Sequence, residues 1–200
     1  WDEKILYAAS AHSTNVSFMK NELSFGFNRA VKNEEEDPST SLRVTSKTEP
    51  EMQEHAFNPE GKSDKEYEYL VWNVRFEGAN SNISIAAEGK ADSRANYLLG
   101  NDPKKHCTNV PDYKVITYKN IYDNIDLKYY GSSNHLKYDF VIKPYANVSD
   151  IKMTYRGIKN IRINENGELL LLTAWGEVKE EKPCTYQYLN GKKTEINSSY

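Results

Sequence analysis

The stretch from Tyr113 to Lys143 is rich in tyrosine and alternates apolar with polar side chains. From Leu136 to Ile142 every second residue is apolar, and most of the residues between them are charged. A period of two is typical of a strand with one buried face. Ile125 to Tyr130 has the character of a second strand, and the turn-forming residues Gly131 to Asn134 connect the two. The sequence therefore predicts an antiparallel hairpin at the centre of the chain.

The N-terminal half carries similar signals. Lys4 to Ala9, Asn15 to Met19 and Leu23 to Phe27 predict three short strands that form a small meander. Tyr67 to Glu77 alternates clearly, with Leu70, Trp72, Val74 and Phe76 on one face, and predicts a central strand. Ile83 to Ala87 and Ala95 to Leu99 predict two more strands, followed by an irregular crossing loop from Gly100 to Pro111.

Two Asn-Gly pairs punctuate the C-terminal part. Asn166-Gly167 and Asn190-Gly191 both lie between alternating segments, and each predicts a tight hairpin because both residue types tolerate positive φ. Turn signals about every ten residues and little helical periodicity are typical of an antiparallel sandwich. We therefore predict one all-β, antiparallel β-sandwich-like unit over residues 1–200, with two packed lobes, 1–100 and 101–200, as the alternative arrangement.

Residues 33–66 break the pattern. They hold ten acids, four bases and few apolar side chains, which predicts a polar, acidic insertion or long loop. Within it, Met52, Ala56 and Phe57 are the best candidates for anchoring it to the rest of the domain.

Composition excludes several classes of protein. The formal net charge is -3, and the lysines and arginines are scattered among acids, which argues against a nucleic-acid binder. No apolar run approaches the roughly 20 residues that a membrane-spanning helix needs. The four histidines lack the spacing of a metal site, and no nucleotide-binding or hydrolase motif occurs, so we expect no cofactor, no metal and no catalytic residue.

Two carboxylates and two cysteines are the remaining candidates for chemistry. Asp126 and Asp139 lie on the two strands of the central hairpin and form a possible glycosidase pair, although a solvent-facing acid beside lysines is the simpler explanation of Asp139. Cys107 and Cys184 either form one disulfide or are two unrelated thiols. A bridge would close a long loop, for which chain entropy gives about 4 kcal/mol of stabilisation.

Aromatic side chains are the best candidates for a binding surface. Tyr129 and Tyr130 are adjacent on a predicted strand, so one points into the core and the other lies outside. The outer ring is able to stack on a sugar or to anchor a protein partner. Trp72 and Trp175 have apolar neighbours, which favours the core for both.

The chain also resembles the N-terminal β domain of large secreted or cell-surface bacterial proteins of the Bacteroidetes type. Members of that group carry propeller-type or immunoglobulin-like repeats and a sorting domain for type IX secretion and gliding motility. The resemblance covers most of the chain outside residues 33–66. The matching segments are WDEKILY (1–7), VRFEGAN (74–80), NYLLGNDP (96–103), TNVPDY (108–113), YKNIYDNIDLKYYG (118–131), LKYDFV (136–141), Lys182-Pro183 and Tyr186-Gln187.

The chain departs from this pattern at a few positions. Tyr145 stands where the group usually has a glycine after the proline, which puts the turn at Pro144 in doubt. Cys107 and Cys184 both replace residues that are not cysteine in the pattern. Their joint appearance, together with the export that the resemblance implies, favours the disulfide.

The resemblance implies a non-catalytic, extracellular or cell-surface module of a larger bacterial protein, with a structural, adhesion or interaction role. Its partners would be other domains of the same polypeptide and a surface glycan or protein. A carbohydrate-binding module with exposed aromatics is the first alternative. A glycan-processing enzyme is the second, and it requires two carboxylates that face each other in a cleft.

Overall fold

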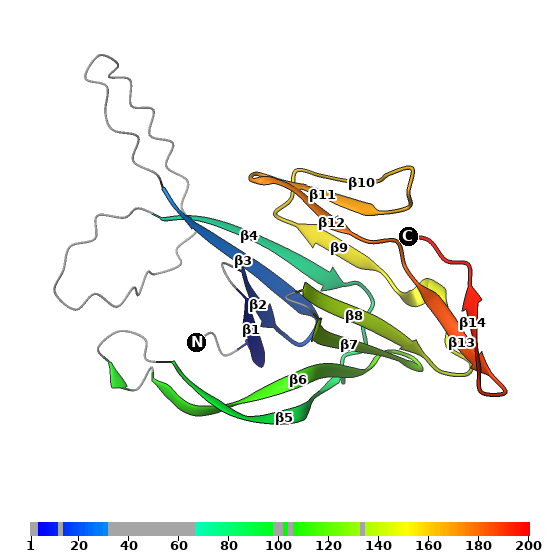
Figure 1. Cartoon of the computed structure of the whole chain (residues 1–200), viewed down its shortest axis with the longest axis horizontal. Coiled ribbons are helices and arrows are strands. Elements are labelled where there is room, and N and C mark those ends of the chain that lie inside the picture. The colour runs from blue at the N-terminus through cyan, green and yellow to red at the C-terminus, as the bar shows by residue number, and fades with distance from the viewer. Residues whose placement is uncertain (1–3, 12–13, 32–66, 98–101, 104–105, 133–134) are drawn as a thin grey trace, which may run out of the picture.

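The computed structural model describes residues 4–11, 14–31, 67–97, 102–103, 106–132 and 135–200 (Figure 1). The regular structure of these residues is antiparallel β-strand, with a turn of 3-10 helix, η2 (Val148–Asp150). The all-β, sandwich-like fold predicted from the sequence is confirmed. No helix in the described part of the chain is long and apolar enough to cross a membrane. The predicted insertion at 33–66, with Met52, Ala56 and Phe57, lies outside the described residues.

Sheet A has five strands in the order β1-β2-β3-β4-β9. The predicted N-terminal meander is confirmed, and β4 pairs on both sides, with β3 and β9, so it is the central strand that its alternation predicted. The strands are β1 (Tyr7–Ala11), β2 (Thr14–Phe18), β3 (Glu22–Ala30), β4 (Tyr67–Phe76) and β9 (Met153–Arg156).

Sheet B contains β5 (Ser84–Tyr97), β6 (Cys107–Tyr122), β7 (Ile125–Ser132) and β8 (His135–Ile142), in that order. The central hairpin is the β7–β8 pair, as predicted. Two predictions were wrong: residues 84–87 and 95–97 of the two predicted strands are parts of one long strand, and Pro111 lies within β6. Pro111 lies opposite Arg94, where β6 pairs only with β5, and proline is tolerated in a strand that has an unpaired edge.

Two smaller sheets complete the chain. Sheet C contains β10 (Asn160–Ile163), β11 (Leu169–Thr173) and β12 (Gly176–Glu180), and a separate hairpin contains β13 (Thr185–Leu189) and β14 (Lys192–Ile196). Both predicted Asn-Gly hairpins form. Asn190 and Gly191 both have positive φ, whereas at the first turn only Gly167 does, because the Asn164 side chain accepts hydrogen bonds from the N–H groups of Asn166 and Glu168.

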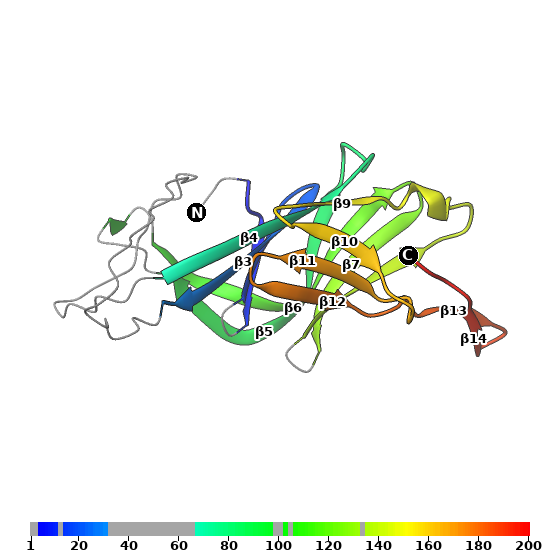
Figure 2. The same cartoon turned by 90° about the horizontal axis from the view of Figure 1, so that it is seen from above.

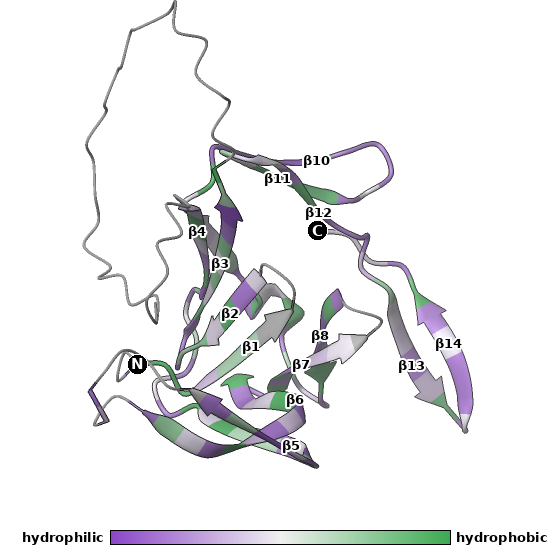
Figure 3. Cartoon of the chain, turned by 60° about the vertical axis from the view of Figure 1, so that its left-hand side comes forward, coloured by the Kyte–Doolittle hydropathy of each residue, from purple (hydrophilic) through white to green (hydrophobic). Residues whose placement is uncertain are grey.

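The core lies between the inner faces of sheets A and B, and sheet C adds the buried Leu169 and Leu171 to it. Trp72 is buried and stacks on Phe25 with ring centroids 4.1 Å apart, as its predicted core position requires. Figure 3 shows the alternation of apolar and polar residues along the strands as alternating green and purple. Trp175 is only half-buried, and the guanidinium of Arg29 lies 4.5 Å from its ring, so its predicted core position was wrong.

Sheet C lies beside β9, and the β13–β14 hairpin projects away from the sheets (Figures 1 and 2). Sheets A and B each combine strands from before and after residue 100, through the β4–β9 and β5–β6 pairs. The alternative division into lobes 1–100 and 101–200 therefore does not match the way the strands pair.

Candidate functional site

The outer face of sheet A carries a row of exposed side chains on its central strand. Tyr67, Tyr69 and Val71 alternate with residues that face the core, and they are 51%, 62% and 41% exposed. Because side chains two apart on a strand point the same way, about 7 Å apart, the two tyrosines form a continuous surface. We call Tyr67, Tyr69 and Val71, together with Gly26 and Asn28 of β3, the tyrosine platform.

On β3, the platform consists of a glycine and an asparagine, which are smaller than the tyrosines of β4. Asn28 pairs with Tyr69 and Gly26 with Val71. A Cβ atom at Gly26 would have only the Asn15 carbonyl oxygen within 4 Å, at 3.9 Å, so the position opposite Val71 is an open trough. Ser24 and Asn73 form the next pair along the face.

Among the described residues of this face, charged side chains begin at the level of this polar pair. Arg75 lies opposite Glu22, and Arg156 of β9 lies opposite Asn73. The five platform residues themselves carry no formal charge. The platform is therefore a flat, neutral surface of two aromatic rings with amide and hydroxyl groups beside them.

The β13–β14 hairpin holds a second exposed aromatic pair. Tyr186 and Tyr188 are 46% and 66% exposed, and their rings meet edge to face at 5.9 Å. The ammonium of Lys193 lies 4.0 Å from the centroid of the Tyr186 ring. One face of Tyr186 is thus already occupied by a cation from its own hairpin.

Tyr129 and Tyr130 point to opposite faces of sheet B, as predicted. Tyr129 is 4% exposed and packs against Phe18, and burial raises its pKa well above the ordinary value. It therefore takes no part in a surface, which corrects its place among the candidate binding residues. Tyr130 is half-buried on the outer face, where its hydroxyl donates to Asp139 at 3.1 Å.

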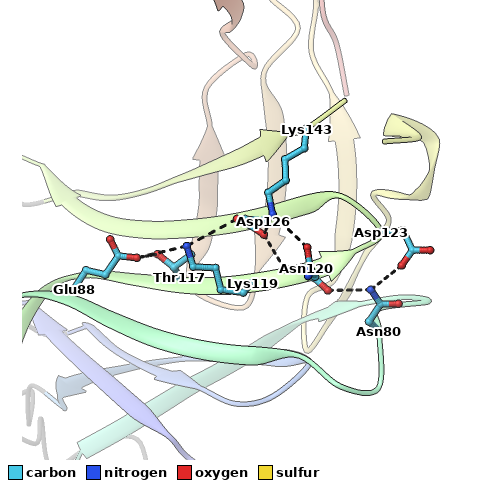
Figure 4. Close-up of polar contacts among 8 residues, drawn as sticks. All are labelled: Asn80, Glu88, Thr117, Lys119, Asn120, Asp123, Asp126 and Lys143. Atoms are coloured by element: carbon cyan, nitrogen blue, oxygen red, sulfur yellow. Dashed lines mark hydrogen bonds and ion pairs between the residues drawn. The ribbon is translucent and has the colours of Figure 1, made fainter. Parts of the chain in front are cut away.

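A polar network on the outer face of sheet B is centred on Asp126 (Figure 4). This carboxylate is 5% exposed, accepts a hydrogen bond from the Asn120 N–H at 2.8 Å and pairs with the Lys143 ammonium at 2.7 Å. Burial acts to raise the pKa of Asp126, but these two contacts and the more distant Lys119 outweigh it and lower the pKa. Asp126 is therefore an ionised anchor for the irregular end of β6.

The same network continues to the turn after β4. Asn80 donates through its side chain to the Asn120 carbonyl at 3.0 Å and to Asp123 at 3.1 Å. Asn120 and Asn124 both have positive φ, which asparagine tolerates better than most residues. These side chains, with Ser81 and Asn82, line an open polar cavity of about 410 Å³. Three of the lining residues, Asn80, Asn120 and Asp123, are already joined by hydrogen bonds, which is the pattern of a structural junction.

The two carboxylates proposed as a glycosidase pair, Asp126 and Asp139, are diagonal neighbours on the β7–β8 hairpin. The two residues share a face of the β7–β8 hairpin, but Asp126 lies opposite Val141, and Asp139 lies opposite Lys128. Each carboxylate is held by another partner, Lys143 for Asp126 and Tyr130 for Asp139. Among the described residues, no three histidine, cysteine, aspartate or glutamate side chains group to hold a metal ion.

Comparison with known protein families gives one match. The profile of a domain of unknown function, DUF7948, matches residues 1–200. The chain belongs to the DUF7948 family. Searches of curated proteins and of solved structures returned no match. Membership of this family does not by itself indicate a biochemical role.

A half-buried carboxylate also connects three sheets of this DUF7948 domain. Glu180 of β12 accepts hydrogen bonds from Tyr138 of β8 at 2.9 Å and from Tyr155 of β9 at 3.1 Å. Burial raises the pKa of Glu180, and the hydroxyls of Tyr138, Tyr155 and Tyr200 offset part of that rise. No pattern in the sequence points to this cluster, because its members are distant along the chain.

Glu180 should give the stability of the domain a recognisable pH dependence. Since its pKa is raised above the ordinary 4.5, the folded state holds the proton more tightly than the unfolded chain. The stability that this proton provides is complete below pH 4.5 and is lost as the pH rises through the folded-state pKa. Urea unfolding across this range should show wild type losing stability relative to Glu180→Gln as the pH rises. Tyr138→Phe removes a hydrogen bond to the carboxylate and should move the loss to higher pH, whereas a gain with rising pH would contradict the assignment.

Both cysteines of this DUF7948 domain are free thiols, Cys107 half-buried and Cys184 exposed. Cys107 begins β6 at one end of sheet B, whereas Cys184 lies just before β13 at the other end of the molecule (Figure 1). The disulfide favoured in the sequence analysis is therefore not formed in this structure.

Proposed function

We propose that this DUF7948 domain is a non-catalytic, extracellular or cell-surface module of a larger bacterial protein, with an adhesion or interaction role. The tyrosine platform is the observation that carries the proposal. Its side chains stay exposed although the strand beneath them packs a complete core, with Trp72 and Val74 3% and 5% exposed. Rigid aromatic rings on a regular sheet are well suited to contact a partner, because little side-chain entropy is lost on binding.

The location and the larger protein rest on the resemblance described above. It supports export, other domains in the same polypeptide and a type IX sorting domain. A carbohydrate-binding module is the second candidate function, favoured by Asn28, which lies opposite Tyr69 on the neighbouring strand. Rings with neighbouring amides are able to contact both the apolar face and the hydroxyl groups of a sugar.

The location can be tested on the cells that produce the protein. An antibody to residues 1–200 should label intact cells, and protease added outside them should remove that signal while a cytoplasmic marker survives. Detection only after lysis, with full protection from added protease, would contradict the proposed location. This test does not depend on the identity of any ligand.

A further inference from the structure

We propose that the tyrosine platform is the binding site for a neutral polysaccharide, laid across β3 and β4. The inference rests on the proposed binding role of the domain and specifies its ligand. Four features of the surface carry it: the spacing of the rings, the polar groups beside them, the open trough and the lack of charge.

The rings provide the apolar contact. Tyr69 is 62% and Tyr67 51% exposed, and both side chains leave the same face of one strand. The C–H face of a pyranose ring is apolar, so it packs on an exposed aromatic ring with its hydroxyls directed sideways. Two rings about 7 Å apart along a strand are placed to contact successive parts of one extended chain.

The hydroxyl groups of such a chain find partners at the edges of the rings. Asn28 lies directly opposite Tyr69, and Ser24 continues the same face, whereas the Oδ1 atom of Asn73 is buried. Amides offer both donors and acceptors, which matches a hydroxyl that does both. The trough at Gly26 leaves room for a chain to lie low beside Val71, since a Cβ there would have nothing closer than the Asn15 carbonyl oxygen at 3.9 Å.

The lack of charge selects among glycans. The platform residues are neutral, and among the residues that the structure describes the nearest charges on this face are Arg156, opposite Asn73, and Arg75, opposite Glu22. A polymer of uronic acids or a sulfated glycan would lose hydration at each anionic group without gaining a cation from the described residues beside Tyr67 or Tyr69. The neutral surface therefore favours an uncharged polysaccharide.

Affinity electrophoresis of the purified 200-residue chain tests the proposal. Gels containing mixed-linkage β-glucan, xyloglucan or galactomannan represent neutral polymers, and gels containing alginate or hyaluronan represent acidic ones. We expect retardation by at least one neutral polymer and by neither acidic one. Tyr69→Ala should weaken the binding about tenfold, the loss of one stacked ring.

Two further variants separate binding from folding. Gly26→Leu puts a side chain into the trough, where its Cβ atom fits because Gly26 does not have positive φ and the nearest atom lies 3.9 Å away, and it should weaken the binding as well. Tyr188→Ala removes an equally exposed ring on the β13–β14 hairpin and should leave the binding unchanged. Melting temperatures of all three variants establish that they fold.

Several results would overturn the inference: no retardation by any neutral polymer, retardation by acidic polymers alone, or wild-type binding in both Tyr69→Ala and Gly26→Leu. Capture of a protein partner through Tyr67 and Tyr69 with no polysaccharide binding would also overturn it. In that case the proposed module role would stand, because surface location is measured separately by protease treatment of intact cells.

Discussion

Replacing Gly157 by alanine is expected to lower the free energy of unfolding by about 3 kcal/mol. Gly157 follows the end of β9 and crosses close over the backbone of β4. A Cβ atom there would lie 2.6 Å from the Val71 carbonyl oxygen and 3.1 Å from the Trp72 Cα, and the residue has a φ of +82°. The backbone of a central strand cannot move aside easily, so the contact adds to the cost of positive φ.

Two other glycines separate these contributions. Gly78 has a φ of +69°, and a Cβ atom there would have no neighbour within 4 Å, so Gly78→Ala should cost only about 1 kcal/mol, the effect of positive φ alone. Gly131 has neither positive φ nor a neighbour within 4 Å, and Gly131→Ala should change stability by less than about 0.5 kcal/mol. Urea unfolding followed by tryptophan fluorescence measures all three. A Gly157→Ala effect no larger than that of Gly78→Ala would disprove the close approach.

Local alternation was sufficient to predict most of the strands. The inner residues of β4, Trp72 and Val74 among them, were identified correctly because each strand face has its own period of two. The length of β5 and the position of Pro111 were not predictable in this way. Both depend on which edge of β6 is paired at each point. The register between strands that are distant along the chain cannot be read from the alternation within each strand.

The candidate site was predictable only in part. The alternation that places Trp72 inside also places Tyr69 outside, so the tyrosine row could have been found from β4 alone. The trough was not accessible, because Gly26 meets Val71 only through the register of β3 with β4. The Glu180 cluster was still less predictable, because Tyr138 and Tyr155 lie on other sheets and no periodicity along β12 indicates them.

Asp126→Ala is expected to lower the free energy of unfolding by about 2 to 3 kcal/mol at neutral pH, since it removes two charge-assisted contacts from a buried position. The Asn120 N–H loses its acceptor at 2.8 Å, and Lys143 loses its partner at 2.7 Å. Asn120 has positive φ, so the carboxylate also holds the irregular end of β6 in a conformation that few residues adopt. Urea unfolding at pH 7 measures the loss.

Asp139→Ala is the matched control, because Asp139 lies on the same face of the same hairpin but is exposed, and its loss should cost less than about 0.5 kcal/mol.

The pH dependence of stability shows whether the charge of Asp126 causes the loss. The pKa of Asp126 is lowered below the ordinary 3.8, so its contribution is complete above pH 3.8 and is lost as the pH falls through the folded-state pKa. Wild type and Asp126→Asn should therefore converge in stability only in strong acid. Equal losses for the Asp126 and Asp139 variants, or a difference that persists in strong acid, would show that the charge of Asp126 does not anchor β6.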